Sequence, residues 1–433
     1  MQKELHMIGN AHLDPVWLWR WPEGLQSIRA TFRSALDRMK ETPGFVFTAA
    51  QAAMYEWVER CEPGLFAEIQ DRVREGRWVL VGGWWMQPDC NLPSGEALAR
   101  QSLYGQRYFA EKFGTMARVA YNVDSFGHSA MLPQIFQLSG MKYYVFMRPG
   151  PHEKPDIPGR LFRWRSPDGS EVLAYQIPYS YTSSWGSELK EKIERSAGEL
   201  SDEVPLLMCF YGVGNHGGGP TRENLAAIRE TASAWGADSG RPEVLLSDPY
   251  TFLQAVEARQ LPLPVVEDEL QHHASGCYAA HSPIKALNRR AEHALASAEK
   301  LALAAGVWVG SEYPAADLQR AWQGVLFNQF HDILAGTSVR ESYDDARNLH
   351  GQALQIAEEV SAFSLQSITA RMNLAAPGIP VVVWNPLGHR RTGLVEVEVH
   401  GESSALALVD AEGQEMPWQE TTPSAAIRGK GRR

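Results

Sequence analysis

Residues 5–21 read LHMIGNAHLDPVWLWRW. The stretch begins as a short apolar run, Leu5–Gly9, which predicts a buried strand, and it leads directly to His12 and Asp14. Residues two apart on an extended chain project from the same face, so this imidazole and this carboxylate would lie together beyond the strand. They form either a hydrogen-bonded pair or two ligands of a metal ion.

Apolar runs and amphipathic stretches alternate through roughly residue 250. Helices are predicted between Pro22 and Pro43, where apolar residues recur every three or four positions, and from Ser94 to Gly114. This alternation predicts an α/β fold with parallel strands in a barrel-like or doubly wound sheet. Residues 160–177 read instead as a β-hairpin insertion around a Pro-Asp-Gly turn. Besides Leu5–Gly9, the predicted strands are Phe45–Ala49, Trp78–Gly82, Ala117–Val123, Tyr143–Met147, Leu206–Tyr211 and Val244–Ser247.

The pattern changes twice further along the chain. Helical periodicity alone covers 282–306, 315–335 and 342–372, which predicts a three-helix bundle. From 376 onward the pattern becomes that of period-two strands, but a β-sandwich needs about 100 residues, so only its start is present. We therefore expect three regions, a β/α catalytic domain, a helical domain and an incomplete sandwich, at 1–265, 266–375 and 376–433.

The composition restricts the partners and the compartment. The 433 residues are 44% hydrophobic and 21% charged, which is typical of a globular protein, and the net charge of −10 argues against a nucleic-acid or anionic-membrane partner. Only the last six residues, RGKGRR, form a basic run. No run has the length of a membrane helix, no signal peptide opens the chain, and four scattered cysteines predict no disulfide framework. We expect a reduced, cytoplasmic enzyme.

Chemically active residues follow several predicted strands. Asp124 and His128 follow one strand, His216 lies in a glycine-rich loop after another, and His331-Asp332 lies in the bundle. Two histidines and two carboxylates would suit Zn²⁺. Each residue also has a structural explanation, because Asp124 could cap a helix and His128 or His331 could be a core histidine. The glycine-rich loop lacks the GK[ST] of a phosphate-binding P-loop.

Many aromatic residues lie near these positions. Their flat faces would suit stacking on sugar rings, although packing in the core is the competing explanation. The aromatic residues concerned are Trp17, Trp19, Trp84, Trp85, Tyr211 and Tyr278.

Five segments resemble the glycoside hydrolase family 38 α-mannosidases, in the same order along the chain, from residue 4 to about residue 390. The chain is most similar to the bacterial and cytosolic branch of that family. The segments are NAHLDPVWLW, GGWWMQPDCNLPSGE, YNVDSFGHSAMLPQIF, FYGVGNHGGGPT and FNQFHDILAGTS.

The resemblance implies a seven-stranded β/α barrel, then a three-helix bundle and large β-sandwich domains. It also implies one zinc ion per chain held by His12, Asp14, Asp124 and His331, although a site of this composition could also take Co²⁺ or Mn²⁺. Asp124 would in addition be the catalytic nucleophile. The expected substrate-binding residues are Trp17, Asp89, Arg148, Tyr278 and Asp332.

The implied reaction is zinc-dependent, retaining exo-cleavage of α-mannosides or manno-oligosaccharides through a covalent mannosyl-Asp124 intermediate. A retaining glycosidase also needs an acid/base about 5 Å from its nucleophile. Many family members have an aspartate in the loop that contains His216 here, so His216 is the expected acid/base, with Asp89, Asp156 and Asp332 as alternatives. The family also implies assembly with further copies of the chain.

Two other functions are consistent with the residues. A metal-dependent carbohydrate deacetylase would use histidines and aspartates at strand ends to hold a zinc ion that activates water. An inactive, truncated mannosidase fragment would keep the ligands but lack the later domains.

Overall fold

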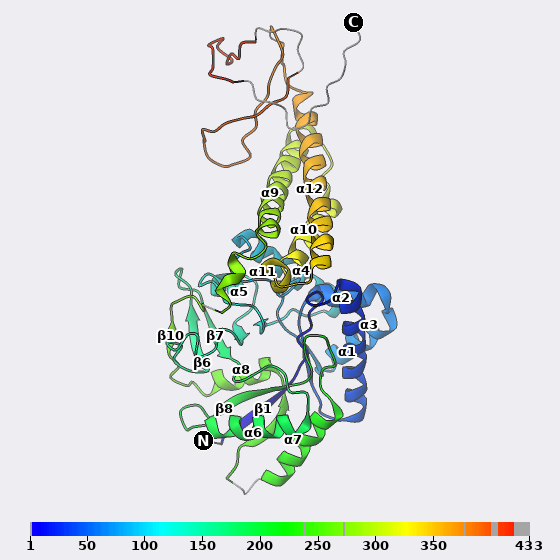
Figure 1. Ribbon diagram of the computed structural model, residues 1–433, viewed down its shortest axis with the longest axis vertical. Coiled ribbons are helices and arrows are strands. Elements are labelled where there is room, and N and C mark those ends of the chain that lie inside the picture. Colours follow the sequence, from blue (N-terminus) through cyan, green and yellow to red (C-terminus); the bar gives the residue numbers. More distant parts are fainter. Residues whose placement is uncertain (1, 237–239, 272, 376, 400–405, 420–433) are drawn as a thin grey trace. The chain divides into compact units, whose positions relative to one another are not determined.

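The computed structural model describes residues 2–236, 240–271, 273–375, 377–399 and 406–419. The chain divides into two compact units, Met1–Asn373 and Leu374–Arg433. The first unit contains all the helices and strands described below, and its α/β region and helical region appear in Figure 1.

Strand β1, Glu4–Gly9, is the centre of a parallel three-stranded sheet. It pairs on one side with β8, Leu206–Tyr211, and on the other with β9, Glu243–Ser247. The carboxyl end of β1 therefore lies beside that of β8, with Gly9 opposite Tyr211. This register places the segment containing His12 next to the glycine-rich loop that follows β8.

The other strands form two more sheets. A five-stranded sheet has the order β10-β6-β7-β5-β4, and a two-stranded parallel sheet joins β2 to β3. The bounds are β2 Phe47–Ala49, β3 Trp78–Leu80, β4 Val119–Asn122, β5 Tyr143–Phe146, β6 Leu161–Arg165, β7 Glu171–Gln176 and β10 Val265–Val266.

Main-chain contacts connect the sheets at the ends of their strands. Asn10 forms a bridge with Thr48, and the Gly82 N–H donates to the carbonyl of Val119 at 2.8 Å. The predicted parallel pairing is confirmed for β1, β4 and β5 with their neighbours. Because the described strands form three small sheets, a closed seven-stranded barrel stays a prediction.

The predicted hairpin at 160–177 is present, but it is not an insertion. Strands β6 and β7 pair antiparallel, and β7 also pairs in parallel with β5 in the middle of the five-stranded sheet. The run VLAY within β7 is buried, so the strand needs neighbours on both edges and both faces. This is why the hairpin belongs to the core.

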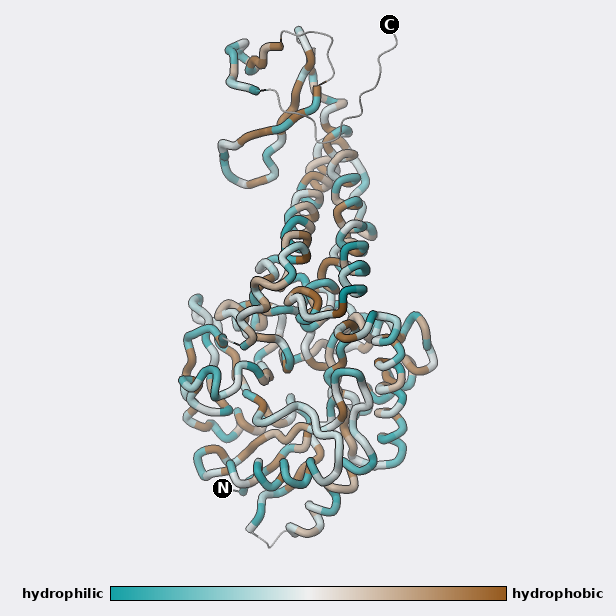
Figure 2. The backbone as a smooth tube through the Cα atoms, viewed as in Figure 1, coloured by the Kyte–Doolittle hydropathy of each residue, from teal (hydrophilic) through white to brown (hydrophobic). Residues whose placement is uncertain are grey.

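Helices cover the strands on the outside. Figure 2 shows hydrophobic colour along the buried strands and hydrophilic colour on outer helices such as α6. The prediction from Ser94 to Gly114 is confirmed as α4: the Ser94 hydroxyl accepts from the Ala97 N–H at 3.2 Å, and Gly114 ends the helix in the left-handed region. The helices of this region are α1 Trp21–Glu41, α2 Ala52–Cys61, α3 Pro63–Arg74, α4 Gly95–Phe113, α5 Leu132–Leu138, α6 Gly186–Glu199, α7 Arg222–Trp235 and α8 Pro249–Ala258.

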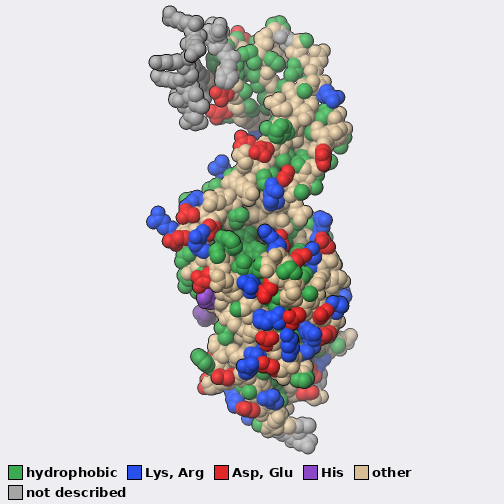
Figure 3. Space-filling model, turned by 90° about the vertical axis from the view of Figure 1, so that its right-hand side faces the viewer, with side chains coloured by type: hydrophobic (Ala, Val, Ile, Leu, Met, Phe, Trp, Pro, Cys, Tyr) green, Lys and Arg blue, Asp and Glu red, His purple; other side chains and the backbone are tan. Residues whose placement is uncertain are grey.

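Acidic and basic side chains are intermixed on the face of the molecule that Figure 3 shows. Helices α1 and α3 meet there through ion pairs, including Arg33 with Glu68 at 2.7 Å and Lys40 with Glu68 at 3.1 Å. None of the described helices combines the length and the apolar composition that crossing a membrane requires.

The helical region contains α9, Ser282–Val309, which lies alongside α12, Arg340–Thr369 (Figure 1). The second predicted helix, 315–335, is wrong as a continuous helix. It divides into α10, Ala315–Asn328, and the short α11, His331–Ala335, because Phe330 is extended with φ −47° and ψ 136°. This break turns the chain toward the strands immediately before His331.

The second unit contains no regular strand among its described residues, so the predicted start of a β-sandwich is wrong for them. One bridge joins Val409 to Glu415 across a turn. Side chains such as Leu394 and Val395 are exposed, because the described part of this unit provides no second layer to bury them. Residues 400–405 and 420–433, which include the basic run, lie outside the described residues.

Gly105 provides a test of how closely α4 packs on the segment after β3. A Cβ at this position would lie 2.5 Å from the carbonyl oxygen of Gly83. We expect Gly105→Ala to lower the free energy of unfolding by about 1–3 kcal/mol, as overpacked cores do. Gly351 in α12 has open space around it, so Gly351→Ala should raise stability by up to about 1 kcal/mol through helix propensity. Urea unfolding followed by circular dichroism would measure both, and equal effects would contradict the packing argument.

Candidate functional site

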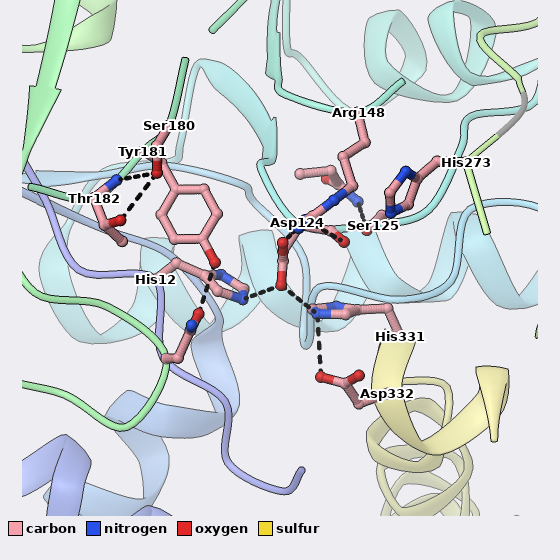
Figure 4. Close-up of polar contacts among 12 residues, drawn as sticks. His12, Asp124, Ser125, Arg148, Ser180, Tyr181, Thr182, His273, His331 and Asp332 are labelled. Carbon is pink, nitrogen blue, oxygen red and sulfur yellow. Dashed lines mark hydrogen bonds and ion pairs between the residues drawn. The ribbon is translucent and has the colours of Figure 1, made fainter. Parts of the chain in front are cut away.

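Four side chains from three segments meet where the strands end. His12 and Asp14 follow β1, Asp124 follows β4, and His331 is the first residue of α11. Each offers one nitrogen or oxygen atom, and these atoms all lie within 4.8 Å of one another. Figure 4 shows the Asp124 carboxylate between the rings of His12 and His331.

The distances in this cluster fit a metal ion. The His12 Nε2 lies 2.8 Å from Asp14 Oδ1 and 3.8 Å from Asp124 Oδ2, and the His331 Nε2 lies 3.7 Å from Asp124 Oδ2. Tetrahedral zinc with bonds of about 2.0–2.2 Å separates its ligand atoms by about 3.3–3.6 Å. The His12 Nε2, the His331 Nε2 and Asp14 Oδ1 are buried, and none of them makes a hydrogen bond of acceptable geometry within the described residues, although the first and last are close together. Buried polar atoms need a partner, and an ion at their centre would satisfy all three.

His331 is fixed by the segment that follows β3. Its Nδ1 lies 3.0 Å from the carbonyl oxygen of Gln87, and its main-chain N–H donates to the same oxygen. A carbonyl oxygen can only accept, so Nδ1 carries the proton and Nε2 presents its lone pair to the cluster. A bridge between Pro88 and Phe330 and a hydrogen bond from the Asp89 N–H to the Gln329 carbonyl hold the two segments together.

The glycine-rich loop after β8 positions His12 and Asp14. The Asn215 N–H donates to the His12 carbonyl at 2.6 Å, and its own carbonyl accepts from the Asp14 N–H at 3.0 Å. Gly212 has φ +124°, and a Cβ there would lie 2.3 Å from the carbonyl oxygen of Asn10. This glycine is therefore required by the close approach of the loop to the β1 segment.

Besides its place in the cluster, Asp124 pairs with an arginine. Its Oδ1 forms an ion pair with Nη1 of Arg148, which follows β5, and the same Nη1 donates to the Asp124 carbonyl at 3.4 Å. The carboxylate is therefore directed at the metal cluster through Oδ2 and at a guanidinium through Oδ1. A neighbouring positive charge favours the ionised carboxylate that both a metal ligand and a nucleophile require.

Burial shifts the acid–base behaviour of the residues around the cluster. It lowers the pKa of His12, which favours the unprotonated ring that a metal requires. It raises the pKa of Asp89, and it raises the pKa of Asp332 to about 6. Asp332 lies beside the cluster, with Oδ2 3.7 Å from the His331 Nε2 and Oδ1 accepting from the Thr337 hydroxyl at 2.6 Å.

Of the five predicted substrate-binding residues, two contact the cluster and the other three have different partners. Trp17 is half-buried with its ring 5.8 Å from that of Trp19, and Arg148 and Asp332 lie at the cluster. The Asp89 carboxylate is buried and accepts from two main-chain N–H groups of its own turn. Tyr278, in the short helix Ser275–Tyr278, donates its hydroxyl to Gln271.

The predicted acid/base, His216, is not brought to the cluster by any contact in the described structure. Its side chain is 54% exposed, its Nε2 lies 2.8 Å from a carboxylate oxygen of Glu23, and its ring lies on that of Trp19. Of the alternatives, Asp156 is also exposed and pairs with Lys154. Asp332 is the alternative that directly neighbours a ligand.

Several residues near the cluster were not predicted. Gln87 acts through its carbonyl, so its side-chain type gives no signal in the sequence. Tyr181 lies edge-on to the His12 ring and donates its hydroxyl to Asn215. His273 pairs with Glu153 and lies near Arg148 in Figure 4. Phe126 packs against His331. The only feature of the sequence that could have indicated this contact is that Phe126 lies two residues after Asp124.

Two buried imidazoles and two carboxylates, one of which also pairs with an arginine, form a cluster that could hold a divalent metal ion. Comparison with known families identifies the family of the chain. The model of the glycosyl hydrolases family 38 N-terminal domain matches residues 2–276, and that of the alpha mannosidase middle domain matches 272–368. The chain belongs to glycosyl hydrolases family 38.

Its relatives are longer proteins. The chain is 33% identical to the alpha-mannosidase 2C1 of Homo sapiens over 94% of its own length and 39% of that protein. It is 30% identical to an alpha-mannosidase of Saccharomyces cerevisiae over 78% of its length and 32% of the relative. The fold resembles the crystal structure of an alpha-mannosidase from Enterococcus faecalis, with a TM-score of 0.74, 20% identity, and coverage of 85% of this chain and 43% of the other.

Whether this cluster binds a metal ion can be tested without any assay of activity. His331→Ala removes a ligand that is already oriented by Gln87, so we expect the purified variant to lose the stoichiometric divalent metal measured by elemental analysis. His216→Ala is the matched control, because His216 lies outside the four-ligand set. Equal metal content in the two variants would contradict the assignment.

Proposed function

We propose that this chain carries the catalytic site of a zinc-dependent, retaining exo-α-mannosidase that removes terminal α-mannosyl residues. The observation that supports this proposal best is the double placement of Asp124, whose two carboxylate oxygens lie toward the ligand cluster and toward Arg148. A carboxylate used only to bind a metal would not need the guanidinium.

In the proposed reaction, Asp124 attacks the anomeric carbon and forms a mannosyl ester as the bond to the leaving oxygen breaks. That oxygen takes a proton from the acid, and the same group later deprotonates the water that hydrolyses the ester. Arg148 keeps Asp124 ionised and oriented, and Trp17 and Asp332 hold the sugar ring. Bound by His12, Asp14, Asp124 and His331, zinc would supply Lewis-acid and template chemistry toward the vicinal hydroxyls of mannose.

The remaining assignments extend this proposal. We propose Asp89 and Tyr278 as further substrate contacts, a β/α barrel at 1–265, and a helical domain at 266–375 that contributes His331. Two histidines and two carboxylates suit zinc, and cobalt or manganese would also fit this ligand set. A cytoplasmic location is consistent with four free cysteines, three of them buried. Assembly with further copies of the chain stays a prediction.

The direct test combines metal removal with replacement of the nucleophile. We expect the chain to hydrolyse an aryl α-mannoside, a chelator to abolish hydrolysis, and added zinc to restore it. Asp124→Asn should lower kcat by about 10³-fold or more, since it removes the attacking group, and a mannosyl-enzyme should be detected by mass spectrometry only with Asp124 present. Near-normal turnover by Asp124→Asn would exclude the mechanism.

Other outcomes point to the alternative functions. Release of acetate from an acetylated sugar without glycosidic cleavage would favour a deacetylase. Stoichiometric metal without any hydrolysis would mean that the site forms but that the chain is an inactive part of a mannosidase.

The acid/base can be identified by using two leaving groups. We propose His216 and Asp332 as the candidates, the first from its loop and the second from its place beside His331. Replacing the true acid, by His216→Gln or Asp332→Asn, should slow hydrolysis of an alkyl mannoside by about 10²–10⁴-fold, but affect a dinitrophenyl mannoside much less because that group leaves unprotonated. Azide should restore turnover of the activated substrate by that variant alone. A variant that loses both substrates equally has lost binding instead.

A further inference from the structure

His128 has no part in the proposed reaction, but it lies where four segments of the active site meet. Its main-chain N–H and carbonyl both bond to Leu270, at 2.9 Å each, and it forms a bridge with Cys90 in the segment after β3. It follows Asp124 by four residues, and its side chain is fully buried. These main-chain contacts therefore hold His128 in place independently of its ring.

The ring of His128 has one defined arrangement of protons. Its Nε2 lies 2.7 Å from the carbonyl oxygen of Arg148, and its Nδ1 lies 2.7 Å from the hydroxyl of Tyr144. The carbonyl can only accept, so Nε2–H donates to it and Nδ1 accepts from the hydroxyl. Burial lowers the pKa of His128 to about 3, so the ring is neutral at ordinary pH and keeps this arrangement.

The Nε2–H of His128 donates to the main-chain carbonyl of Arg148, the residue whose side chain pairs with Asp124. Arg148 lies just beyond the end of β5, and its guanidinium pairs with Asp124. Fixing its carbonyl limits rotation of the main chain at that residue, and so limits where the guanidinium can reach. Tyr144 belongs to β5, and its ring packs on that of Trp164 with the ring centroids 5.4 Å apart. The His128 ring therefore connects the Arg148 carbonyl to a side chain that is held by strand β5.

We propose that His128 is a positioning residue, whose Nε2–H holds the Arg148 carbonyl so that the guanidinium stays on Asp124. The consequence for catalysis rests on the proposed function, in which Asp124 is the nucleophile. The positioning of Arg148 by His128 does not rest on that function, because the pairing of Arg148 with Asp124 can be monitored by chemical modification of the arginine.

Two substitutions separate this hydrogen bond from simple packing. The amide nitrogen of glutamine can occupy the place of Nε2, whereas that of asparagine can occupy only the place of Nδ1. We expect His128→Asn to lower kcat by about 10–100-fold with KM close to that of the unaltered chain. His128→Gln should recover most of the loss. Similar damage in both variants would assign His128 to packing alone and overturn the proposal.

The second readout needs no activity. Phenylglyoxal modifies guanidinium groups, and peptide mass spectrometry gives the rate for each arginine. Modification of Arg148, whose side chain is 27% exposed, should be faster in His128→Asn than in His128→Gln, while the exposed Arg222 serves as an internal reference. Metal content is measured in each variant. An unchanged Arg148 rate in His128→Asn would overturn the proposal.

The two readouts also distinguish failure of this proposal from failure of the proposed function. If the unaltered chain cleaves no mannoside, the proposed function fails and the Arg148 rates still decide the role of His128. If His128→Asn does not fold, His128→Leu takes its place, because it removes the Nε2–H donor and keeps a buried side chain at this position. Arg148 should then react faster than in the unaltered chain, and an unchanged rate would overturn the proposal.

Discussion

The convergence of four buried ligand atoms is the constraint on which the rest of the structure depends. These atoms come from three segments that are far apart in the sequence, and three of the four have no hydrogen-bond partner among the described residues. Their mutual separations would leave lone pairs uncompensated in a dry interior unless a cation lies among them. The surrounding main chain must therefore hold each ligand to within a few tenths of an ångström.

Main-chain contacts do most of this positioning. The loop that carries Asn215 runs beside the His12 segment, the carbonyl of Gln87 sets the tautomer of His331, and the bridge at Phe330 fixes the start of α11. None of these depends strongly on side-chain type at the contacting residue. The glycines of the loop matter for the space they leave, as the contact of Gly212 with Asn10 shows.

The sequence could predict much of the fold and the ligands because both depend on side-chain type. β8, for example, has the predicted bounds Leu206–Tyr211, and the four histidines and aspartates lie together as expected. The division of the helix at Phe330 could not be predicted, since nothing in helical periodicity indicates an extended residue between α10 and α11. Nor could the surroundings of His216, because its partner Glu23 is on a distant helix. The position of β7 within the sheet was missed because a local turn motif does not reveal which strand lies on the other edge.

The break between α10 and α11 also makes the site a link between the first strand and the bundle. Any ligand that binds only the assembled cluster stabilises the packed arrangement of these two parts by RT ln(1 + [L]/Kd). A bound ion would thus act as a non-covalent cross-link between parts that are far apart in the sequence. A disulfide acts by restricting the unfolded ensemble, whereas this ion would stabilise only the assembled form. The described cysteines are all free, so a bound ion would provide a cross-link in a chain that has no disulfide among its described residues.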